Sequence, residues 1–270
     1  MSFIANARMY AVSPEAEAAW RELLGHIAAD AGVELAYEAY PAPQPLEDLW
    51  RRPDLGCVFM CGYPVALRIA EVTPLASPIP AADWAGGEPV YRSDLIVRAD
   101  SAFGTLEDTF GGRAGWTVTH SHSGFNAFRH HLLRYRTAVR PVLYGEMIGE
   151  LVTARRVLDA VGDGTIDVGP LDAYWHMLIA KYRPELTAGV RVVESTDLAP
   201  APAFVASPAL PAGAVDRLRA AFAGAAAQDW FAPLGEALCL EGFARVTRGD
   251  FNATLRWHAA AKAAAYPFPA

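Results

Sequence analysis

Alternating strand and helix patterns in the first third of the chain constrain its fold more than any other feature. The run Leu55–Cys61 is wholly apolar and of strand length, as expected for a strand that is buried on both faces. Further strands are predicted at Ala7–Val12 and Val33–Tyr40, and helices at Pro14–Ala31 and Leu46–Arg52. This βαβαβ order implies a parallel sheet with right-handed crossovers, and therefore an α/β fold.

A second series follows the Pro-, Ala- and Gly-rich stretch 74–89, which is predicted to be a loop. Its expected strands are Tyr91–Arg98, Ala114–Val118, Ile166–Gly169, Val190–Ser195 and Ala203–Ser207, and its expected helices are Phe125–Arg136, Gly145–Val161 and Leu171–Tyr182, with more helices to the end. Two series predict two lobes, each a mostly parallel sheet flanked by helices. The first lobe is predicted to contain residues 1–92 and 197–270, and the second residues 93–196. In such folds a ligand lies at the carboxyl ends of the strands, where the lobes face each other.

Composition excludes several classes of function. Of 270 residues 53% are hydrophobic and 20% charged, which is typical of a well-buried globular protein. The net charge of −7 and the scattered basic residues argue against a nucleic-acid partner. No apolar run is long enough to predict a membrane-spanning helix. The three cysteines, Cys57, Cys61 and Cys239, give no disulfide framework. Cys57 and Cys61 are expected to be buried, inert thiols, since the segment supplies no further ligands for a metal or redox pair.

The polar loop Thr119–Gly124 lies between a predicted strand and a helix that is expected to open near Phe125. The first N–H groups of a helix lack intrahelical partners, and the helix dipole adds positive potential there. Ser121, Ser123, Gly124 and Phe125 are therefore predicted to bind an anion. The alternative is that these residues only cap the helix.

Aromatic residues suggest that the ligand has an organic part. Tyr10 and Tyr63 follow predicted strands at their carboxyl ends, Tyr91 lies at the first crossover, and Trp116 lies in the second lobe. Each either lines a cleft or packs under a loop.

Two further polar residues are candidates for ligand contacts. Thr153 is a possible second oxyanion donor, or else a mid-helix residue without a ligand contact. Asp172 could accept a hydrogen bond from a ligand amine or hydroxyl, or could cap the helix that follows it.

Four histidines raise the possibility of a zinc site: His120, His122, His130 and His131. The first two lie on the loop and the others more than one turn into the helix, so the pairs are predicted to be too far apart. We therefore expect no metal, and His122 is predicted to line the anion loop. The sequence contains no nucleophile elbow, Walker loop or dinucleotide fingerprint, so we expect no cofactor and no enzymatic activity.

Several segments, in this order and spacing, resemble a known family. They are LEDTFGG at 106–112, SHSG at 121–124, RRVLDAVGDGTIDVG at 155–169 and PAP at 200–202. Together they resemble the phosphate/phosphonate-type (PhnD-like) periplasmic solute-binding proteins of ABC transporters. The family's Gly-Ser-His before the third segment appears here as Val152-Thr153-Ala154, so Thr153 stands where the family has Ser.

The resemblance implies a two-lobed, type II periplasmic-binding-protein fold that closes by a hinge on a small organic anion, either a phosphonate, a phosphate ester or another oxyanion. It also implies ABC-type uptake, an ABC permease as partner and a periplasmic location. The N-terminus lacks a recognisable signal peptide, which instead predicts the cytoplasm. A cytoplasmic ligand sensor, or an enzyme using a His and Asp172 as acid and base, is the alternative. We expect a monomer or a weak dimer.

Overall fold

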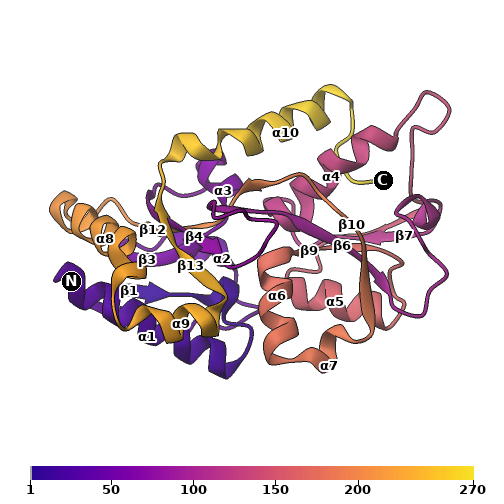
Figure 1. Cartoon of the computed structure of the whole chain (residues 1–270). Coiled ribbons are helices and arrows are strands. Elements are labelled where there is room, and N and C mark those ends of the chain that lie inside the picture. The colour runs from indigo at the N-terminus through magenta and orange to yellow at the C-terminus, as the bar shows by residue number, and fades with distance from the viewer. Residues whose placement is uncertain (1) are drawn as a thin grey trace. The chain divides into compact units, whose positions relative to one another are not determined.

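The computed structural model describes residues 2–270, which form two compact units (Figure 1). The first unit comprises the chain up to Tyr91 together with Pro200–Asn252, and the second comprises Arg92–Ala199 and Ala253–Ala270. The sequence-based division placed 197–270 in the first lobe. In the structure residues Ala253–Ala270 instead belong to the second unit. This tertiary contact cannot be predicted from a local sequence pattern. No helix within residues 2–270 is long and apolar enough to cross a membrane.

The first unit contains a six-stranded sheet in the order β13-β4-β12-β3-β1-β2. Its strands are β1 (Phe3–Asn6), β2 (Leu35–Tyr37), β3 (Leu55–Met60), β4 (Thr73–Pro80), β12 (Ala203–Ala206) and β13 (Leu240–Arg245). β1 pairs in parallel with β2 and β3, whereas β12 is antiparallel to β3 and β4, and β13 is antiparallel to β4. The α/β class is confirmed, but the sheet is mixed rather than mostly parallel.

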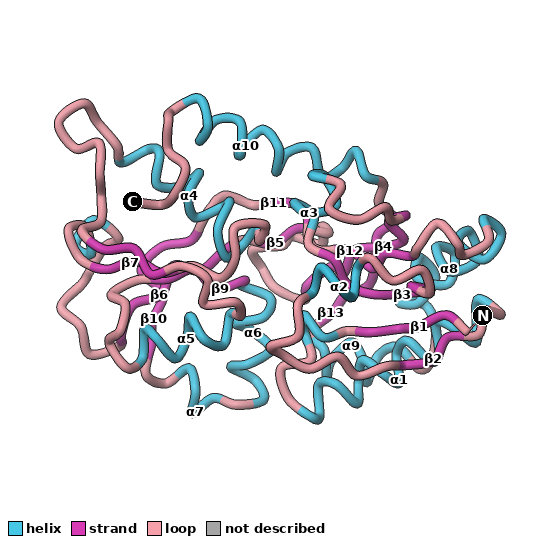
Figure 2. The backbone as a smooth tube through the Cα atoms, turned by 180° about the vertical axis from the view of Figure 1, so that it is seen from behind, coloured by secondary structure: helices cyan, strands magenta, loops and turns pink. Residues whose placement is uncertain are grey.

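Helices cover both faces of this sheet (Figures 1 and 2). They are α1 (Pro14–Ala31), α2 (Leu46–Trp50), α3 (Gly62–Leu67), α8 (Ala212–Gly224) and α9 (Phe231–Leu238). All six residues of β3 are buried, and successive side chains point to opposite faces. Phe59 stacks on Phe204, which in turn stacks on Phe222 of α8, while Val58 belongs to the core beneath α2 and α3.

Helix capping for α1 and a continuous apolar run for β3 were sufficient to predict these two elements. α1 begins after Ser13, whose hydroxyl accepts a hydrogen bond from the Ala16 N–H at 3.2 Å, and ends at Gly32 in the left-handed conformation. The strand expected at Ala7–Val12 is wrong, because β1 ends at Asn6 and Arg8–Tyr10 is a 3-10 turn. The loop expected at 74–89 is confirmed for 81–89 but wrong for 74–80, which belongs to the strand β4.

β4 was missed because it contains three prolines, which have no N–H to donate to a neighbouring strand. Pro74, Pro78 and Pro80 nevertheless lie in register with residues of β12 or β13, and the register shifts once along each pairing. Pairing on both sides keeps this segment in the sheet, although three of its eight residues have no N–H to donate. β13 was missed as well, because helices were expected from Ser207 to the end.

The second unit is built on β6 (Ser93–Arg98), which lies between β10 (Val190–Ser195) and β9 (Gly169–Asp172) and is antiparallel to both. β7 (Arg113–Gly115) pairs in parallel with β8 (Glu146–Ile148). A parallel bridge from Ala114 to Val168, just before β9, joins the two sheets. The strand order across the unit is therefore β10-β6-β9-β7-β8. The short strands β5 (Val90–Tyr91) and β11 (Ala199–Pro200) pair where the chain crosses between units.

In the second unit, α4 (Ala127–Leu132) and α10 (Asn252–Ala263) lie on one side of the sheet, and α5 (Ala154–Gly162), α6 (Ala173–Tyr182) and α7 (Pro184–Thr187) on the other (Figures 1 and 2). The helix expected at Gly145–Val161 is wrong in its first half, which forms β8 and a turn. The helix expected near Phe125 begins earlier, as a π-helical turn at His122–Asn126 that continues into α4.

Candidate functional site

Three helices begin at one edge of the second unit's sheet. β9, β7 and β8 are neighbours that run in the same direction, and each leads at its carboxyl end into a helix. The three helices have polar N-caps: Asp172 for α6, Ser121 for the π-helical turn and α4, and Thr153 for α5. Because neighbouring parallel strands end at the same edge of a sheet, three helix starts come together there. Two of them, at Ser121 and Thr153, have uncharged caps and keep the positive potential of a helix N-terminus.

Ser121 and the π-helical turn, together called the Ser121 turn (Ser121–Asn126), lie at the centre of this edge. The Ser121 hydroxyl accepts from the Gly124 N–H at 3.0 Å, and the Ser121 carbonyl accepts from the Asn126 N–H at 3.0 Å. This five-residue spacing is a π-helical bond, and such bulges occur frequently at functional sites. The Ser93 hydroxyl donates to the Ser123 carbonyl at 2.9 Å, which fixes the turn to the start of β6.

Gly124 is required by its close approach to the strand end. A Cβ at this position would lie 2.0 Å from Thr117 Oγ1 and 2.8 Å from Thr117 Cγ2. The Thr117 N–H donates to the Gly124 carbonyl at 3.2 Å, so the two backbones are held together. Thr117 is buried, and within the described part of the chain its hydroxyl has no hydrogen-bond partner.

The cap of α5 is joined to the same strand end. The Leu151 and Val152 N–H groups donate to the carbonyls of Trp116 and Thr117, both at 3.1 Å. The Thr153 N–H donates to the Leu151 carbonyl at 2.8 Å, and Val152 between them has φ of 69°. This is the pattern of a classic γ-turn, which is rare and strained for a β-branched residue. The two hydrogen bonds to Trp116 and Thr117 hold this strained turn at the strand end, and strain of this kind clusters at functional sites.

Thr153 and Asp172 both act as caps. The Thr153 hydroxyl accepts from the Arg156 N–H at 3.2 Å, so Thr153 precedes α5 and is not a mid-helix residue. Asp172 Oδ1 accepts from the Tyr174 and Trp175 N–H groups, at 3.0 Å each. Asp172 is also the register partner of Ser93. Ser93 and Thr117 were not found from the sequence, because only strand pairing brings them to the turn.

The predicted aromatic residues divide between the units. Tyr10, Tyr63 and Tyr91 lie in the first unit and are buried. The ring of Tyr10 packs edge-on against Phe59 at 5.0 Å, and the Tyr91 hydroxyl lies 3.5 Å from Cys61 Sγ.

Trp116 and Phe125 lie in the second unit, with ring centroids 5.8 Å apart. Trp116 also stacks on Phe268 at 5.8 Å, and its Nε1 is buried with no partner among residues 2–270. Both residues are buried, and their rings pack together at the Ser121 turn, to which Phe125 belongs.

The histidines separate rather than converge. The His122 ring lies against Trp257, and its Nδ1 accepts from the Asn126 side-chain amide at 3.2 Å. The prediction that His122 lines the anion loop is therefore corrected: its ring is 1% exposed and is directed at α10. Burial lowers the pKa of His122 to about 3, so the ring is neutral at pH 7.

The other histidines have their own partners. The His130 ring stacks on Trp257, and His131 Nε2 donates to a Glu194 carboxylate oxygen at 2.9 Å. Burial lowers the pKa of both. Across the described residues, no group of three or more His, Cys, Asp or Glu side chains could hold a metal ion.

A serine, a histidine and an aspartate also meet in the second unit, but in an order that does not suit nucleophilic catalysis. The Ser195 hydroxyl donates to Asp94 Oδ1 and His176 Nδ1 to Asp94 Oδ2, both at 2.9 Å. The carboxylate thus lies between the hydroxyl and the imidazole. A Ser-His-Asp triad needs the imidazole in the middle, where it can take the proton from serine.

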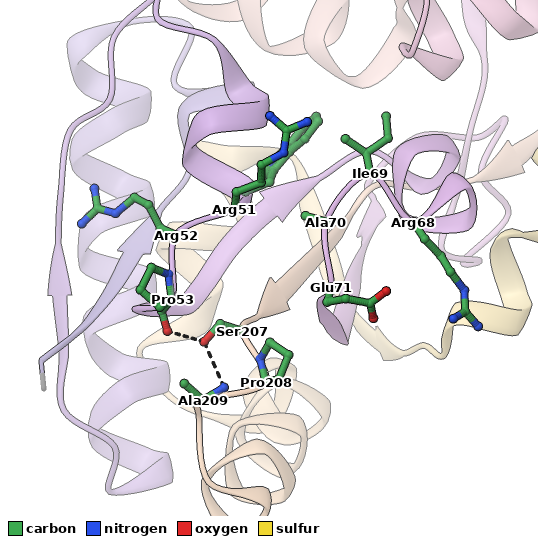
Figure 3. A pocket seen from close by; sticks show the side chains of 11 residues that line it. Arg51, Arg52, Pro53, Arg68, Ile69, Ala70, Glu71, Ser207, Pro208 and Ala209 are labelled. Atoms are coloured by element: carbon green, nitrogen blue, oxygen red, sulfur yellow. Dashed lines mark hydrogen bonds between the residues drawn. The ribbon is translucent and has the colours of Figure 1, made fainter.

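A cavity of about 410 Å³ in the first unit is separate from the predicted site residues. Arg51, Arg52, Arg68 and Glu71 are among its lining residues, and it lies at the amino end of β3, whereas Tyr63 follows the carboxyl end. Figure 3 shows the arginine side chains directed to different sides. Arg52 is paired with Glu38 and Asp54. These cations therefore do not converge on one ligand group.

The chain forms two α/β units with mixed sheets and crosses between the units repeatedly. This arrangement defines a fold of the periplasmic-binding-protein type. Residues 10–251 match the family described as ABC transporter, phosphonate, periplasmic substrate-binding protein. The chain belongs to this family, and the resemblance seen in its motifs is confirmed.

Solved structures agree on the fold. A binding protein component of an ABC phosphonate transporter from Pseudomonas aeruginosa is 16% identical with a TM-score of 0.79, covering 98% of this chain and 88% of that chain. PhnD1 from Prochlorococcus marinus in complex with methylphosphonate is 14% identical (TM-score 0.77; 97% and 98% covered). XAC2383 from Xanthomonas citri bound to ATP is 18% identical (TM-score 0.65; 98% of each). A comparison with curated proteins found no match.

Proposed function

We propose that this protein is the substrate-binding component of an ABC uptake system, and that it binds a small organic oxyanion at the sheet edge formed by the Ser121 turn and Thr153. The observation that carries the proposal is the convergence of three capped helix starts on the ends of adjacent parallel strands. The helix starts at Ser121 and Thr153, which have uncharged caps, each contribute N–H donors and about 0.3–1 kcal/mol of favourable interaction with an anion, whereas Asp172 occupies the first amides of α6.

The donors in this site are hydroxyl and backbone N–H groups. Ser121 already satisfies the Gly124 N–H, so the Ser123 amide and hydroxyl and the first amides of α5 are the proposed ligand contacts. Hydrogen bonds to an anionic acceptor are roughly twice as strong as neutral ones. Methylphosphonate and ATP, the ligands of two structures with this fold, both carry tetrahedral phosphorus oxyanions. A phosphonate or phosphate ester is therefore the proposed ligand class.

Trp116 and Phe125 are proposed to contact the organic part of the ligand. They lie beside the Ser121 turn, and the buried Trp116 Nε1 is an unused donor within the described chain. Tyr10, Tyr63 and Tyr91 of the first unit, and Asp172, remain proposed contacts. Delivery to an ABC permease and a periplasmic location are proposed because the family consists of periplasmic transport proteins. A monomer or weak dimer suffices for this role.

The test is calorimetric titration with methylphosphonate, inorganic phosphate, methanesulfonate and acetate. We expect Ser121→Ala combined with Ser123→Ala to weaken binding of the tightest of these at least about tenfold, which is about 1.4 kcal/mol. A bound ligand should also raise the melting temperature, and by mass action this rise should grow with the logarithm of the ligand concentration above its Kd.

Ser207→Ala is the matched control. Its hydroxyl accepts from the Ala209 N–H at 3.3 Å, as that of Ser121 accepts from Gly124, but Ser207 lies in the first unit next to the amino end of β3. It should lose stability without losing affinity. Unchanged affinity in the double variant would remove the Ser121 turn from the site.

A further inference from the structure

We propose that the C-terminal segment Ala253–Ala270 positions the Ser121 turn for ligand binding, with Trp257 as the positioning residue at its centre. The part of this proposal that concerns affinity rests on the proposed function. The part that concerns the shape of the turn does not.

One face of the Ser121 turn and α4 is covered by the C-terminal segment. The contacts follow helical spacing, at residues 122, 126, 129 and 130. The Asn126 side-chain amide donates to the Thr254 carbonyl at 2.9 Å. Trp257 lies between two histidines: the His130 ring is stacked on it at 4.8 Å and 9°, and the His122 ring lies at 5.0 Å and 35°.

Arg129 forms hydrogen bonds to the C-terminal segment. Its guanidinium donates to the Pro267 carbonyl and to His258 Nδ1, both at 3.0 Å, and also to Asn126 Oδ1 at 3.0 Å. The arginine thus joins the segment to the same Asn126 whose N–H closes the π-helical turn. Phe268, further on, stacks on Trp116 and approaches Phe125 at 6.3 Å.

The opposite face of the turn is held by the sheet. Ser93 donates to the Ser123 carbonyl and Thr117 to the Gly124 carbonyl. A π-helical turn is a rare conformation. We therefore attribute its persistence to packing from both sides. The sheet fixes where the turn begins, and the C-terminal segment fixes the orientation of the helix that presents the donors.

The histidines at this contact suit a neutral, packed role. Burial lowers the pKa values of His122 and His130, and burial with the nearby Arg129 lowers that of His258. Neutral His258 can accept from Arg129, which a protonated ring could not. The rings therefore act as packing surfaces and acceptors, and Trp257 provides the largest of these surfaces.

The test measures amide hydrogen exchange in ligand-free protein and methylphosphonate affinity by calorimetry. We expect Trp257→Ala to speed exchange of the Gly124 and Asn126 amides at least about tenfold, and to weaken methylphosphonate binding at least about fivefold. Trp257→Phe should restore most of both, because an aromatic ring still packs on His130.

Trp230→Ala is the matched control. Trp230 stacks on His26 at 4.7 Å and 4° in the first unit, so this variant removes the same kind of ring pair elsewhere. It should leave exchange in the turn and affinity unchanged. If Trp257→Ala does not fold, Phe268→Ala, at a residue that is 46% exposed, should speed exchange of the Phe125 and Asn126 amides.

The outcomes are separable. Unchanged exchange in Trp257→Ala, or in Phe268→Ala where that variant replaces it, overturns the positioning role whether or not any anion binds. A second outcome is that Trp257→Ala exchanges faster but binds methylphosphonate as tightly as wild type. If the double variant Ser121→Ala, Ser123→Ala nevertheless binds more weakly, this outcome overturns the link between the C-terminal segment and ligand binding. Wild-type protein that binds none of the probes refutes the proposed function alone, and the exchange data still decide the role of the segment.

Discussion

Gly124→Ala is the substitution for which the structure gives the sharpest expectation. The new Cβ would meet Thr117 Oγ1 at 2.0 Å, Thr117 Cγ2 at 2.8 Å and Thr117 Cβ at 2.9 Å, all well inside van der Waals contact. Thr117 cannot turn away freely, because it is buried and its N–H is bonded to the Gly124 carbonyl. The turn must therefore move away from the strand end.

The magnitude follows from two opposing effects. Overpacking a buried site costs about 1–3 kcal/mol, and the upper end applies here because three atoms are too close. Replacing glycine by alanine in a helical segment returns about 1 kcal/mol. The expected net loss is about 2 kcal/mol, or roughly 4–8 °C in melting temperature for a chain of this size. Anion affinity should fall with it, because the Ser123 amide follows the displaced turn.

Two further variants test whether the clash with Thr117 causes the loss of stability. Gly162→Ala, at the last residue of α5, places its Cβ where nothing lies within 4 Å and should be neutral or slightly stabilising. Thr117→Ala added to Gly124→Ala removes the two side-chain atoms of Thr117 beyond its Cβ and should recover most of the loss. The melting temperatures are measured by calorimetry. A Gly124→Ala protein that melts and binds like wild type would refute the close-packing argument.

Two further predictions concern pH and strain. The pKa of His122 is about 3 in the folded protein and about 6.5 in the unfolded chain. Between these two values only the unfolded chain takes up the proton, so the free energy of unfolding falls by about 1.4 kcal/mol for each pH unit from 6.5 towards 3. His122→Gln should flatten this part of the curve in urea unfolding at pH 7 to 4, and a curve parallel to wild type would contradict the assignment. Val152→Gly should relieve a strain of about 1–3 kcal/mol at φ 69°, which offsets the entropy cost of glycine of about 1 kcal/mol. Stability should therefore be equal or higher. Thr153 should become less well fixed, so anion binding should weaken. Urea unfolding and calorimetry check both effects, and a loss of stability above about 2 kcal/mol would count against strain at this residue.

The capping residues of the proposed site could be predicted from the sequence because helix caps are local. Ser121 is bonded to a group three residues ahead of it, and Thr153 likewise, so the residue types near a helix start carry the signal. Whether such a cap also belongs to a binding edge depends on which strands are neighbours. Ser93 and Thr117 could not be found for that reason: their partners Ser123 and Gly124 are 30 and 7 residues away.

Local hydrophobic periodicity and capping by themselves determined β3, α1 and the α/β class, because each depends on neighbours along the chain. The tertiary structure alone decided the extended path of the proline-containing β4, the mixed strand directions, the burial of His122 and the position of Ala253–Ala270. These features rest on pairing and packing between distant segments. Such contacts can override a local preference, and no pattern within a few residues encodes them.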